Sequence, residues 1–265
     1  MTAFALKILA LTAMVIDHAG VMLFPEVTWL RVVGRVAFPL FAFLAAEGAR
    51  YTRSRLQYLL RLGFFAVVSQ VPYYIAFKGG FLSFADGFSW HVSFLRDTNV
   101  LYTLFLGVLA CAVMKGLKSY FPGVKYQLLR VSLNTLVMAA AALTAGYLHS
   151  DFGIVGVLMV ALAYLTANKW GKLGVIAAGI AVLYTPVGVW LSSFTRLNFY
   201  GKPWAGYGDL MVPAACAALL LIALYNGKRG QGMKWMFYIA YPLHIVVLML
   251  AGMVMTQNWY AYRFW

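Results

Sequence analysis

Four ionisable side chains, Asp17, His18, Arg35 and His244, lie inside long apolar stretches of the sequence. Ionisable groups are costly at membrane depth, and where they occur they usually mark a function. A histidine can take a proton from a nucleophile and return it to a leaving group near neutral pH. These residue types therefore fit two classes of protein: a membrane enzyme with a histidine base, or a transporter with a proton relay.

The depths of these residues along their segments predict that they lie together. At a helical rise of about 1.5 Å per residue, Asp17, His18 and His244 lie about 15 Å from the inner ends of their segments, near the midplane. Arg35 lies about 9 Å from the outer end of its segment. Three more polar residues begin or end segments at the outer face: Asn99, His149 and Asp151. We therefore expect a polar shaft from the outer face to the middle, with two histidines at its floor.

Structural interpretations of the same residues remain open. Asp17 and Arg35 could form an ion pair that only fixes two helices, and His244 could be a hydrogen-bonded structural group. Asp151 could simply cap the helix that follows it. Consecutive residues on a helix point about 100° apart, so Asp17 cannot easily orient His18. A catalytic His18 therefore needs an orienting partner from another segment.

Composition identifies the elements that must position these residues. Of the 265 residues, 63% are hydrophobic and only 11% are charged, whereas the net charge is +14. Soluble domains carry about a quarter charged residues. The composition therefore excludes a disordered chain, a secreted disulfide scaffold and an ordinary soluble enzyme. It also argues against a nucleic-acid partner, because nucleic-acid-binding domains present their charge on a water-soluble surface.

We predict an all-α polytopic membrane protein with one transmembrane domain over residues 1–265. A helix needs about 20 apolar residues to cross the hydrocarbon core. The predicted spans are nine, approximately residues 4–24, 29–50, 56–77, 98–115, 129–148, 152–168, 172–193, 209–227 and 235–257. Most Lys and Arg residues fall at alternate ends of these spans, which predicts a cytoplasmic N-terminus and an outer C-terminus.

A basic run follows the second predicted span: Arg50, Arg53, Arg55 and Arg61. The run is typical of a cytoplasmic loop that contacts anionic lipid head groups, and it could instead bind phosphate. The two cysteines lie inside predicted spans, so no disulfide framework is expected. The sequence also has no Walker loop and no GxSxG elbow. Because it has no paired metal ligands at a fixed spacing, we predict no metal site.

The run ALKILALTAMVIDHAGVMLF at 5–24, followed by LRVVGRVAFPLFAFLAAEGAR at 30–50, closely resembles the TraX family. That family is named for F-pilin acetylation and has relatives among membrane acyltransferases. Further similarity lies in YLLRLGFFAVVSQVPYYIAF at 58–77, NVLYTLFLGVLA at 99–110, DFGIVGVLMVALAY at 151–164 and FYIAYPLHIVVL at 237–248. The Asp-His pair and the Gly-Arg-x-Ala-Phe-Pro-Leu-Phe block are the specific motifs.

The resemblance implies transfer of an acetyl group from cytoplasmic acetyl-CoA to an acceptor reached from the outer face of the inner membrane. On this hypothesis His18 is the base, and Arg35 and Asn99 stabilise the oxyanion. Asp17 balances Arg35, and His244 orients the thioester or acts as a second acid or base. The four arginines of the basic run hold the phosphates of CoA.

The hypothesis leaves several alternatives open. The acceptor, for which Asn99, His149 and Asp151 are the candidate binding residues, could be a pilin N-terminus, an amino sugar or a surface hydroxyl. Transfer could be direct or pass through an acetyl-histidine. The lipid bilayer is the expected surrounding, and homo-oligomerisation is left open. The alternative class is a secondary transporter or flippase with Asp17 and His18 as its proton relay, against which the lack of a visible repeat argues.

Overall fold

The computed structural model describes residues 1–78, 82–83, 89–90, 93–195 and 210–256. These residues are almost entirely helical. The exception is an antiparallel pair of two-residue strands, β1 (Leu82–Ser83) and β2 (Ser89–Trp90). The helices are α1 (Ala3–Met22), α2 (Thr28–Gly34), α3 (Ala37–Tyr51), α4 (Arg55–Lys78), α5 (Ser93–Arg96), α6 (Val100–Tyr120), η1 (Val124–Tyr126), α7 (Gln127–Tyr147), α8 (Gly153–Leu165), α9 (Lys169–Tyr184), α10 (Pro186–Thr195), α11 (Met211–Ala223) and α12 (Lys234–Thr256).

The lengths and compositions of these helices confirm a polytopic α-helical membrane protein. Within the described ranges, six helical segments are long and apolar enough to cross a membrane. They are Ala3–Met22, Thr28–Tyr51, Arg55–Lys78, Val100–Tyr120, Val124–Tyr147 and Trp235–Met255. Gly153–Leu165 and Met211–Ala223 are apolar but shorter. The count of nine spans and the orientation of the termini stay predictions.

Prolines interrupt two of the predicted spans. The span expected over 29–50 is divided at Arg35 and Val36 into α2 and α3. Pro39 has no N–H to donate to the Arg35 carbonyl, and its ring would clash with that carbonyl in a continuous helix. The span expected over 172–193 is divided into α9 and α10, because Pro186 holds Thr185 in an extended conformation (φ −119°, ψ 168°).

The chain forms two compact units, each built from separate stretches of sequence. The first contains residues Met1–Phe41, Phe64–Asn99 and Trp204–Trp265, and the second contains Ala42–Gly63 and Val100–Pro203. The predicted single-domain organisation stays a prediction.

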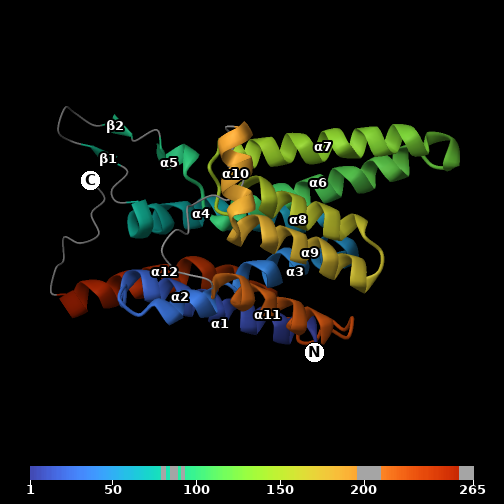
Figure 1. The fold of residues 1–265 in the computed structure, drawn as a ribbon. Coiled ribbons are helices and arrows are strands. Elements are labelled where there is room, and N and C mark those ends of the chain that lie inside the picture. Colours follow the sequence, from blue (N-terminus) through green and yellow to red (C-terminus); the bar gives the residue numbers. More distant parts are fainter. Residues whose placement is uncertain (79–81, 84–88, 91–92, 196–209, 257–265) are drawn as a thin grey trace. The chain divides into compact units, whose positions relative to one another are not determined.

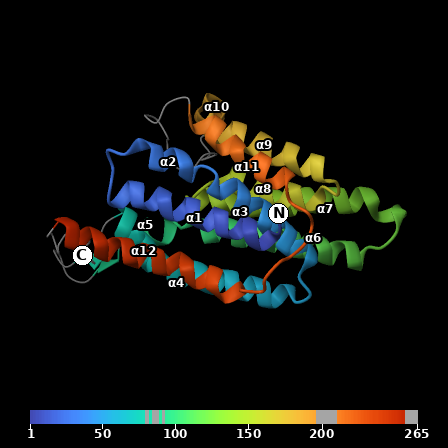
Figure 2. The same ribbon diagram turned by 90° about the horizontal axis from the view of Figure 1, so that it is seen from below.

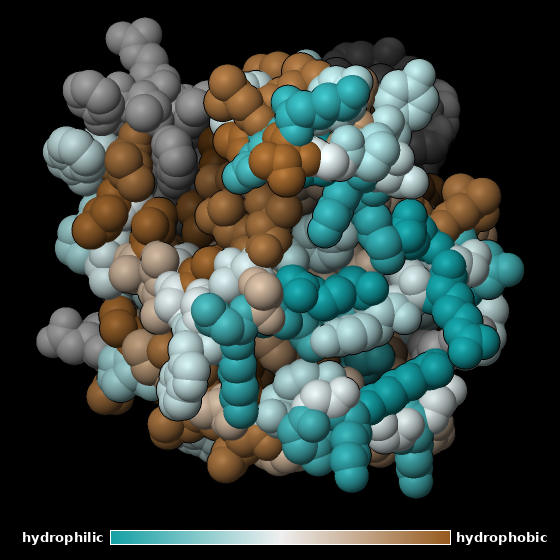
Figure 3. All heavy atoms as spheres, turned by 90° about the vertical axis from the view of Figure 1, so that its right-hand side faces the viewer, coloured by the Kyte–Doolittle hydropathy of each residue, from teal (hydrophilic) through white to brown (hydrophobic). Residues whose placement is uncertain are grey.

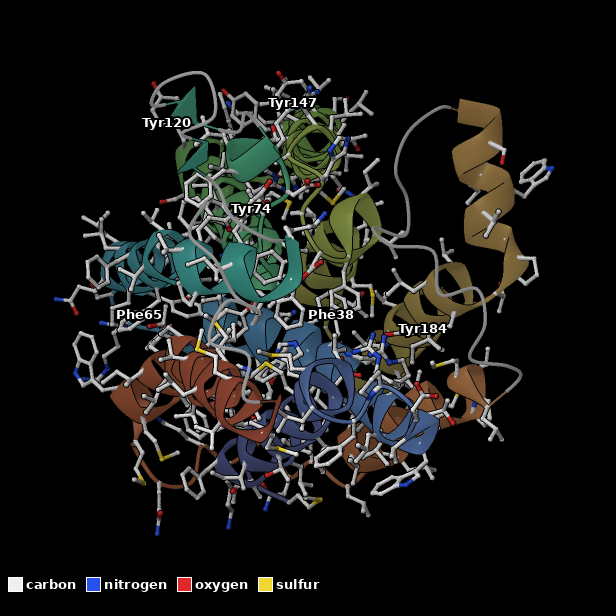
Figure 4. All side chains as sticks on the ribbon, turned by 90° about the vertical axis from the view of Figure 1, so that its left-hand side faces the viewer. Phe38, Phe65, Tyr74, Tyr120, Tyr147 and Tyr184 are labelled. Carbon is white, nitrogen blue, oxygen red and sulfur yellow. The ribbon has the colours of Figure 1, made fainter. Side chains whose placement is uncertain are left out.

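In the first unit, α1 lies between α2 and α12 (Figure 2). A Cβ atom on Gly20 of α1 would lie 2.8 Å from the Leu30 Cβ atom, so glycine allows α1 and α2 to approach closely. The middle of α4 packs on α12 through Phe65 (Figure 4). Its ring stacks on that of Tyr238 with the centroids 5.4 Å apart. These contacts place α2 and α12 against α1, and α4 against α12.

In the second unit, α6, α7, α8 and α9 run side by side (Figure 1). Their core includes one tightly packed cluster of small and branched side chains: Leu106, Ala142, Ala145, Ile154 and Val157. Figure 3 looks onto the end of this unit where α6 is followed by α7 and α8 by α9, and hydrophilic side chains gather there. Lys118 and Lys125 are among the exposed residues of that end.

Large apolar side chains cover much of the helix surfaces that face outward. On α12, Leu243, Val247, Leu250 and Val254 are all exposed and recur at helical spacing. A stripe of this kind would favour aggregation in water, and it is expected where lipid tails cover the helix. The exposed apolar stripe therefore fits a membrane environment for the first unit.

Glycine at position 107 is expected to be required for the packing of α6 on α8. In Gly107→Ala, the new Cβ atom would lie 2.8 Å from the Val160 Cβ atom. Overpacking of this kind costs about 1–3 kcal/mol. The check is a detergent unfolding titration of the purified protein followed by circular dichroism.

Gly116→Ala in the same helix is the matched control, because a Cβ atom there meets nothing within 4 Å. Its free energy of unfolding should equal that of the wild type or exceed it by up to about 1 kcal/mol, since alanine favours a helix over glycine. Equal losses in the two variants would contradict the packing explanation.

Candidate active site

Asp17 on α1 forms ion pairs with two arginines of the α2 segment. Its Oδ2 atom lies 2.9 Å from the Arg31 Nη1 atom, and its Oδ1 atom accepts a hydrogen bond from the Arg35 Nη2 atom. Arg35 also donates from Nε to the Arg31 carbonyl, at 2.9 Å. Arg31 and Arg35 are only 8% and 2% exposed. The Asp17–Arg35 ion pair considered from the sequence is therefore present, and Arg31 joins it.

Arg31 is not among the residues predicted from the sequence, although its spacing from Arg35 is a signal for it. Arg31 and Arg35 are four residues apart, a spacing that places side chains on the same face of a helix. The two arginines can therefore reach one carboxylate on a neighbouring helix. Gly34 makes this approach possible, because a Cβ atom there would overlap the Asp17 side chain.

His18, also on α1, lies against His244 of α12. The His18 Nδ1 and His244 Nε2 atoms are 2.7 Å apart, and the two rings are nearly parallel, with an interplanar angle of 19°. The His244 Nδ1 atom lies 2.9 Å from the Ala240 carbonyl oxygen one turn earlier in α12. The Phe77 ring of α4 contacts His18 edge-on, with the centroids 4.9 Å apart. The structure thus places an imidazole of another helix where a partner for His18 was expected.

Asn99 is hydrogen-bonded through its amide group within the first unit. Its Nδ2 atom donates to the Ala66 carbonyl and to Gln70 Oε1, both at 2.9 Å. Gln70 in turn donates from Nε2 to the carbonyls of Phe94 and Asp97, both at 3.0 Å. This buried network fastens the segment that precedes α6 to α4. Because both amide hydrogens of Asn99 already have carbonyl acceptors, an oxyanion role fits Arg35 better than Asn99.

His149 and Asp151 lie in the second unit, at the turn between α7 and α8. The turn has positive φ angles at His149 (43°) and Phe152 (64°). The Thr103 hydroxyl of α6 contacts this turn, donating to the Asp151 carbonyl. Phe152, and not Asp151, occupies the N-cap position of α8, so the capping interpretation of Asp151 is wrong. Because the backbone at Phe152 is left-handed, α8 begins at Gly153, one residue later than the predicted span.

Arg50, also in the second unit, caps the C-terminal end of α8. Its Nη2 atom donates to the carbonyls of Tyr164 and Thr166, the latter at 2.7 Å. Carbonyls at the end of a helix lack hydrogen-bond donors within the helix, and a guanidinium can donate hydrogen bonds to them. One turn earlier on α3, Glu47 forms an ion pair with Lys172 of α9, and each residue is 6% exposed. This part of the basic run therefore has a structural role.

The remaining donors of the basic run are suited to an anion. The Nε atoms of Arg50, Arg55 and Arg61 are buried and have no hydrogen-bond partner among the described residues. Buried donors are nearly always hydrogen-bonded, and arginine donors match phosphate oxygens in geometry and charge. Arg53, in contrast, is exposed. The side chains present thus fit the phosphates of CoA, with Arg55 and Arg61 the better candidates.

The two groups of predicted residues fall in different units. Asp17, His18, Arg35, Asn99 and His244 belong to the first unit, whereas the basic run and the α7–α8 turn belong to the second. Across the described part of the chain, no group of three or more His, Cys, Asp or Glu side chains could hold a metal ion.

These features define a class of protein: a polytopic helical membrane protein with a partly buried histidine pair beside a largely buried Asp–Arg cluster. The sequence profile of the family described as TraX protein matches residues 3–251. The chain therefore belongs to the TraX family, as the resemblance of its motifs indicated.

Individual relatives agree with this assignment. The chain is 32% identical to the probable fimbrial assembly protein FimC, serogroup H1, of Dichelobacter nodosus, over 95% of this chain and 96% of that protein. It is 28% identical to Protein TraX of Escherichia coli strain K12, over 67% of this chain and 62% of that protein. No solved structure matches the chain significantly.

Removing the charge of Asp17 should destabilise the first unit strongly. In Asp17→Asn, the buried Arg31 and Arg35 lose their carboxylate, and breaking a buried ion pair from one side costs about 3–5 kcal/mol. Unfolding titrations of the detergent-solubilised variant and the wild type measure this loss.

Glu26→Gln is the control, because it removes an exposed carboxylate from the α1–α2 connection. It should change stability by no more than about 0.5 kcal/mol. If Asp17→Asn unfolds like Glu26→Gln, the ion pairs do not hold α1 and α2 together.

Proposed function

We propose that this chain is a membrane-embedded acetyltransferase of the inner membrane that moves an acetyl group from cytoplasmic acetyl-CoA to an acceptor reached from the outer face. The observation that carries the proposal is the His18 imidazole, which lies 2.7 Å from a second imidazole beside a buried Asp–Arg cluster. Membership of the TraX family supports it, since the family takes its name from pilin acetylation.

The proposed reaction uses His18 first as a base and then as an acid. Neutral His18 removes the proton of an acceptor amine or hydroxyl while the acceptor attacks the thioester carbonyl carbon. The tetrahedral intermediate then collapses, the C–S bond breaks, and the departing thiolate takes the proton from His18. A positioned general base contributes about 10²–10⁴-fold to such a step. The same residues serve an acetyl-histidine route, in which the imidazole itself attacks the thioester.

Arg35 supplies positive charge next to the α1 residue that precedes this base, because it pairs with Asp17. It remains paired with Asp17, so its orientation is set before the reaction begins. A preorganised cation stabilises an oxyanion without the reorganisation that water would require. Arg31 holds the other carboxylate oxygen and so prevents Asp17 from rotating away from Arg35.

Acetyl-CoA supplies the activated acyl group, and Arg55 and Arg61 of the second unit are proposed to hold its phosphates. The buried Nε donors of these side chains support this assignment. For the acceptor, the Dichelobacter relative is named as a probable fimbrial assembly protein. We therefore favour the N-terminal amine of a fimbrial or pilin peptide over a glycan hydroxyl, with His149 and Asp151 as the proposed acceptor contacts.

His18→Ala should abolish acetyl transfer without unfolding the protein. Membranes that contain the variant or the wild type are incubated with labelled acetyl-CoA, and mass spectrometry identifies which molecule gains about 42 Da, the mass of an acetyl group. Val21→Ala, an exposed position on the same helix, is the matched control and should retain activity.

Full transfer by His18→Ala would exclude His18 from the mechanism. If the wild type transfers no label but moves substrate across liposomes that lack an acyl donor, the chain is a transporter.

Arg55→Gln and Arg61→Gln should each raise the KM for acetyl-CoA by about tenfold or more, because a hydrogen bond to a charged group contributes about 1.5–3 kcal/mol. Neither should affect the KM for S-acetylpantetheine, which has the thioester but no phosphate. Lys118→Gln, an exposed cation at the end of α6, is the control. A parallel rise for both donors would show that the arginines act on folding and not on phosphate.

A further inference from the structure

We propose that His244 is a positioning residue that sets the tautomer of His18, so that the lone pair of neutral His18 is on Nε2. The Ala240 carbonyl oxygen lies 2.9 Å from His244 Nδ1. A carbonyl oxygen can only accept a hydrogen bond, so the proton of neutral His244 is on Nδ1. The lone pair of His244 is consequently on Nε2.

The contact between His244 and His18 then determines which nitrogen of His18 carries the proton. His244 Nε2, now an acceptor, lies 2.7 Å from His18 Nδ1. Two lone pairs at this distance would repel each other, so His18 Nδ1 carries a proton and donates it. The hydrogen bonds then run in one direction, from His18 through His244 to the α12 backbone. The basic atom of His18 is Nε2.

The surroundings hold both rings in this arrangement. His244 is 9% exposed, and the Tyr241 ring contacts it edge-on with the centroids 5.6 Å apart. Phe77 contacts His18 edge-on at a centroid distance of 4.9 Å. Because His244 is bonded to its own helix backbone, rotation of its ring would break two hydrogen bonds together. The tautomer of His18 is thus coupled to the position of α12.

This role differs from that of a second acid or base. When His18 takes a proton at Nε2, the new positive charge is shared with its Nδ1–H, and the bond to His244 becomes charge-assisted and stronger. The proton on Nδ1 stays on His18, and His244 stays neutral. A hydrogen-bond acceptor that orients a histidine base and stabilises its protonated form is a known catalytic device, usually supplied by a carboxylate.

The direct test is solid-state ¹⁵N NMR of the full chain in lipid, with ¹⁵N-labelled histidine. The chain has only four histidines, and His18→Asn identifies the His18 signals by their loss. Protonated and unprotonated ring nitrogens have well-separated ¹⁵N shifts. We expect wild-type His18 to show protonated Nδ1 and unprotonated Nε2, and His244→Ala to lose this preference.

Two further variants separate positioning from packing. His244→Gln should keep the wild-type tautomer, because Gln Oε1 can accept at the place of Nε2. Leu248→Ala, one turn further along the buried face of α12, removes packing alone and should leave the tautomer unchanged. A wild-type His18 protonated on Nε2, or a His244→Ala spectrum identical to the wild type, would overturn the inference.

An activity measurement extends the inference to the reaction and rests on the proposed function. His244→Ala should lower kcat by about 10²-fold with little change in the KM for acetyl-CoA, and His244→Gln should restore most of kcat. Failure of Gln to restore kcat while the tautomer is kept would show that His244 itself touches the reacting atoms. The expected tautomers in a protein that transfers no acetyl group would refute the proposed function and leave the positioning role in place.

Discussion

A charge inside an apolar helix must find its compensation within the protein, because the hydrocarbon core supplies no water. Asp17 meets this requirement with Arg31 and Arg35, and much of the first unit depends on that contact. The α1 and α2 helices can approach closely because residues 20 and 34 are both glycine. The interruption of the second span at Arg35 follows from Pro39. Ion pairing, close helix packing and a broken helix are thus parts of one local solution.

His18, the residue after Asp17, makes its contacts on a different face of the same helix. Consecutive helical residues point about 100° apart, so His18 points in a different direction from Asp17 and reaches α12 and α4. There it meets His244 and Phe77. One helix therefore presents a carboxylate to α2 and an imidazole to α12, and the Asp-His motif of the family is better understood as two adjacent contacts than as a dyad.

In the second unit, buried charged groups also find their partners within the protein, near the ends of helices. Glu47 and Lys172 compensate each other, and Arg50 satisfies the last carbonyls of α8. Once these contacts are made, the buried Nε donors of Arg55 and Arg61 still have no hydrogen-bond partner among the described residues. The basic run thus divides into a structural part and a part with hydrogen-bonding capacity left for an anion, which is where the proposed donor phosphates belong.

The sequence by itself determined the class of protein, the family, and the residues Asp17, His18, Arg35 and His244. It could do so because a charge within an apolar run is conspicuous whatever the packing, and because the Asp-His and Gly-Arg motifs are local. Only the tertiary structure decided that His18 faces His244, that Arg31 shares Asp17, and that the Asn99 amide is already hydrogen-bonded. Such pairings depend on the rotation and separation of helices far apart in the chain. The spacing of residues along one helix shows which of them share a face, but it does not show which other helix packs against that face.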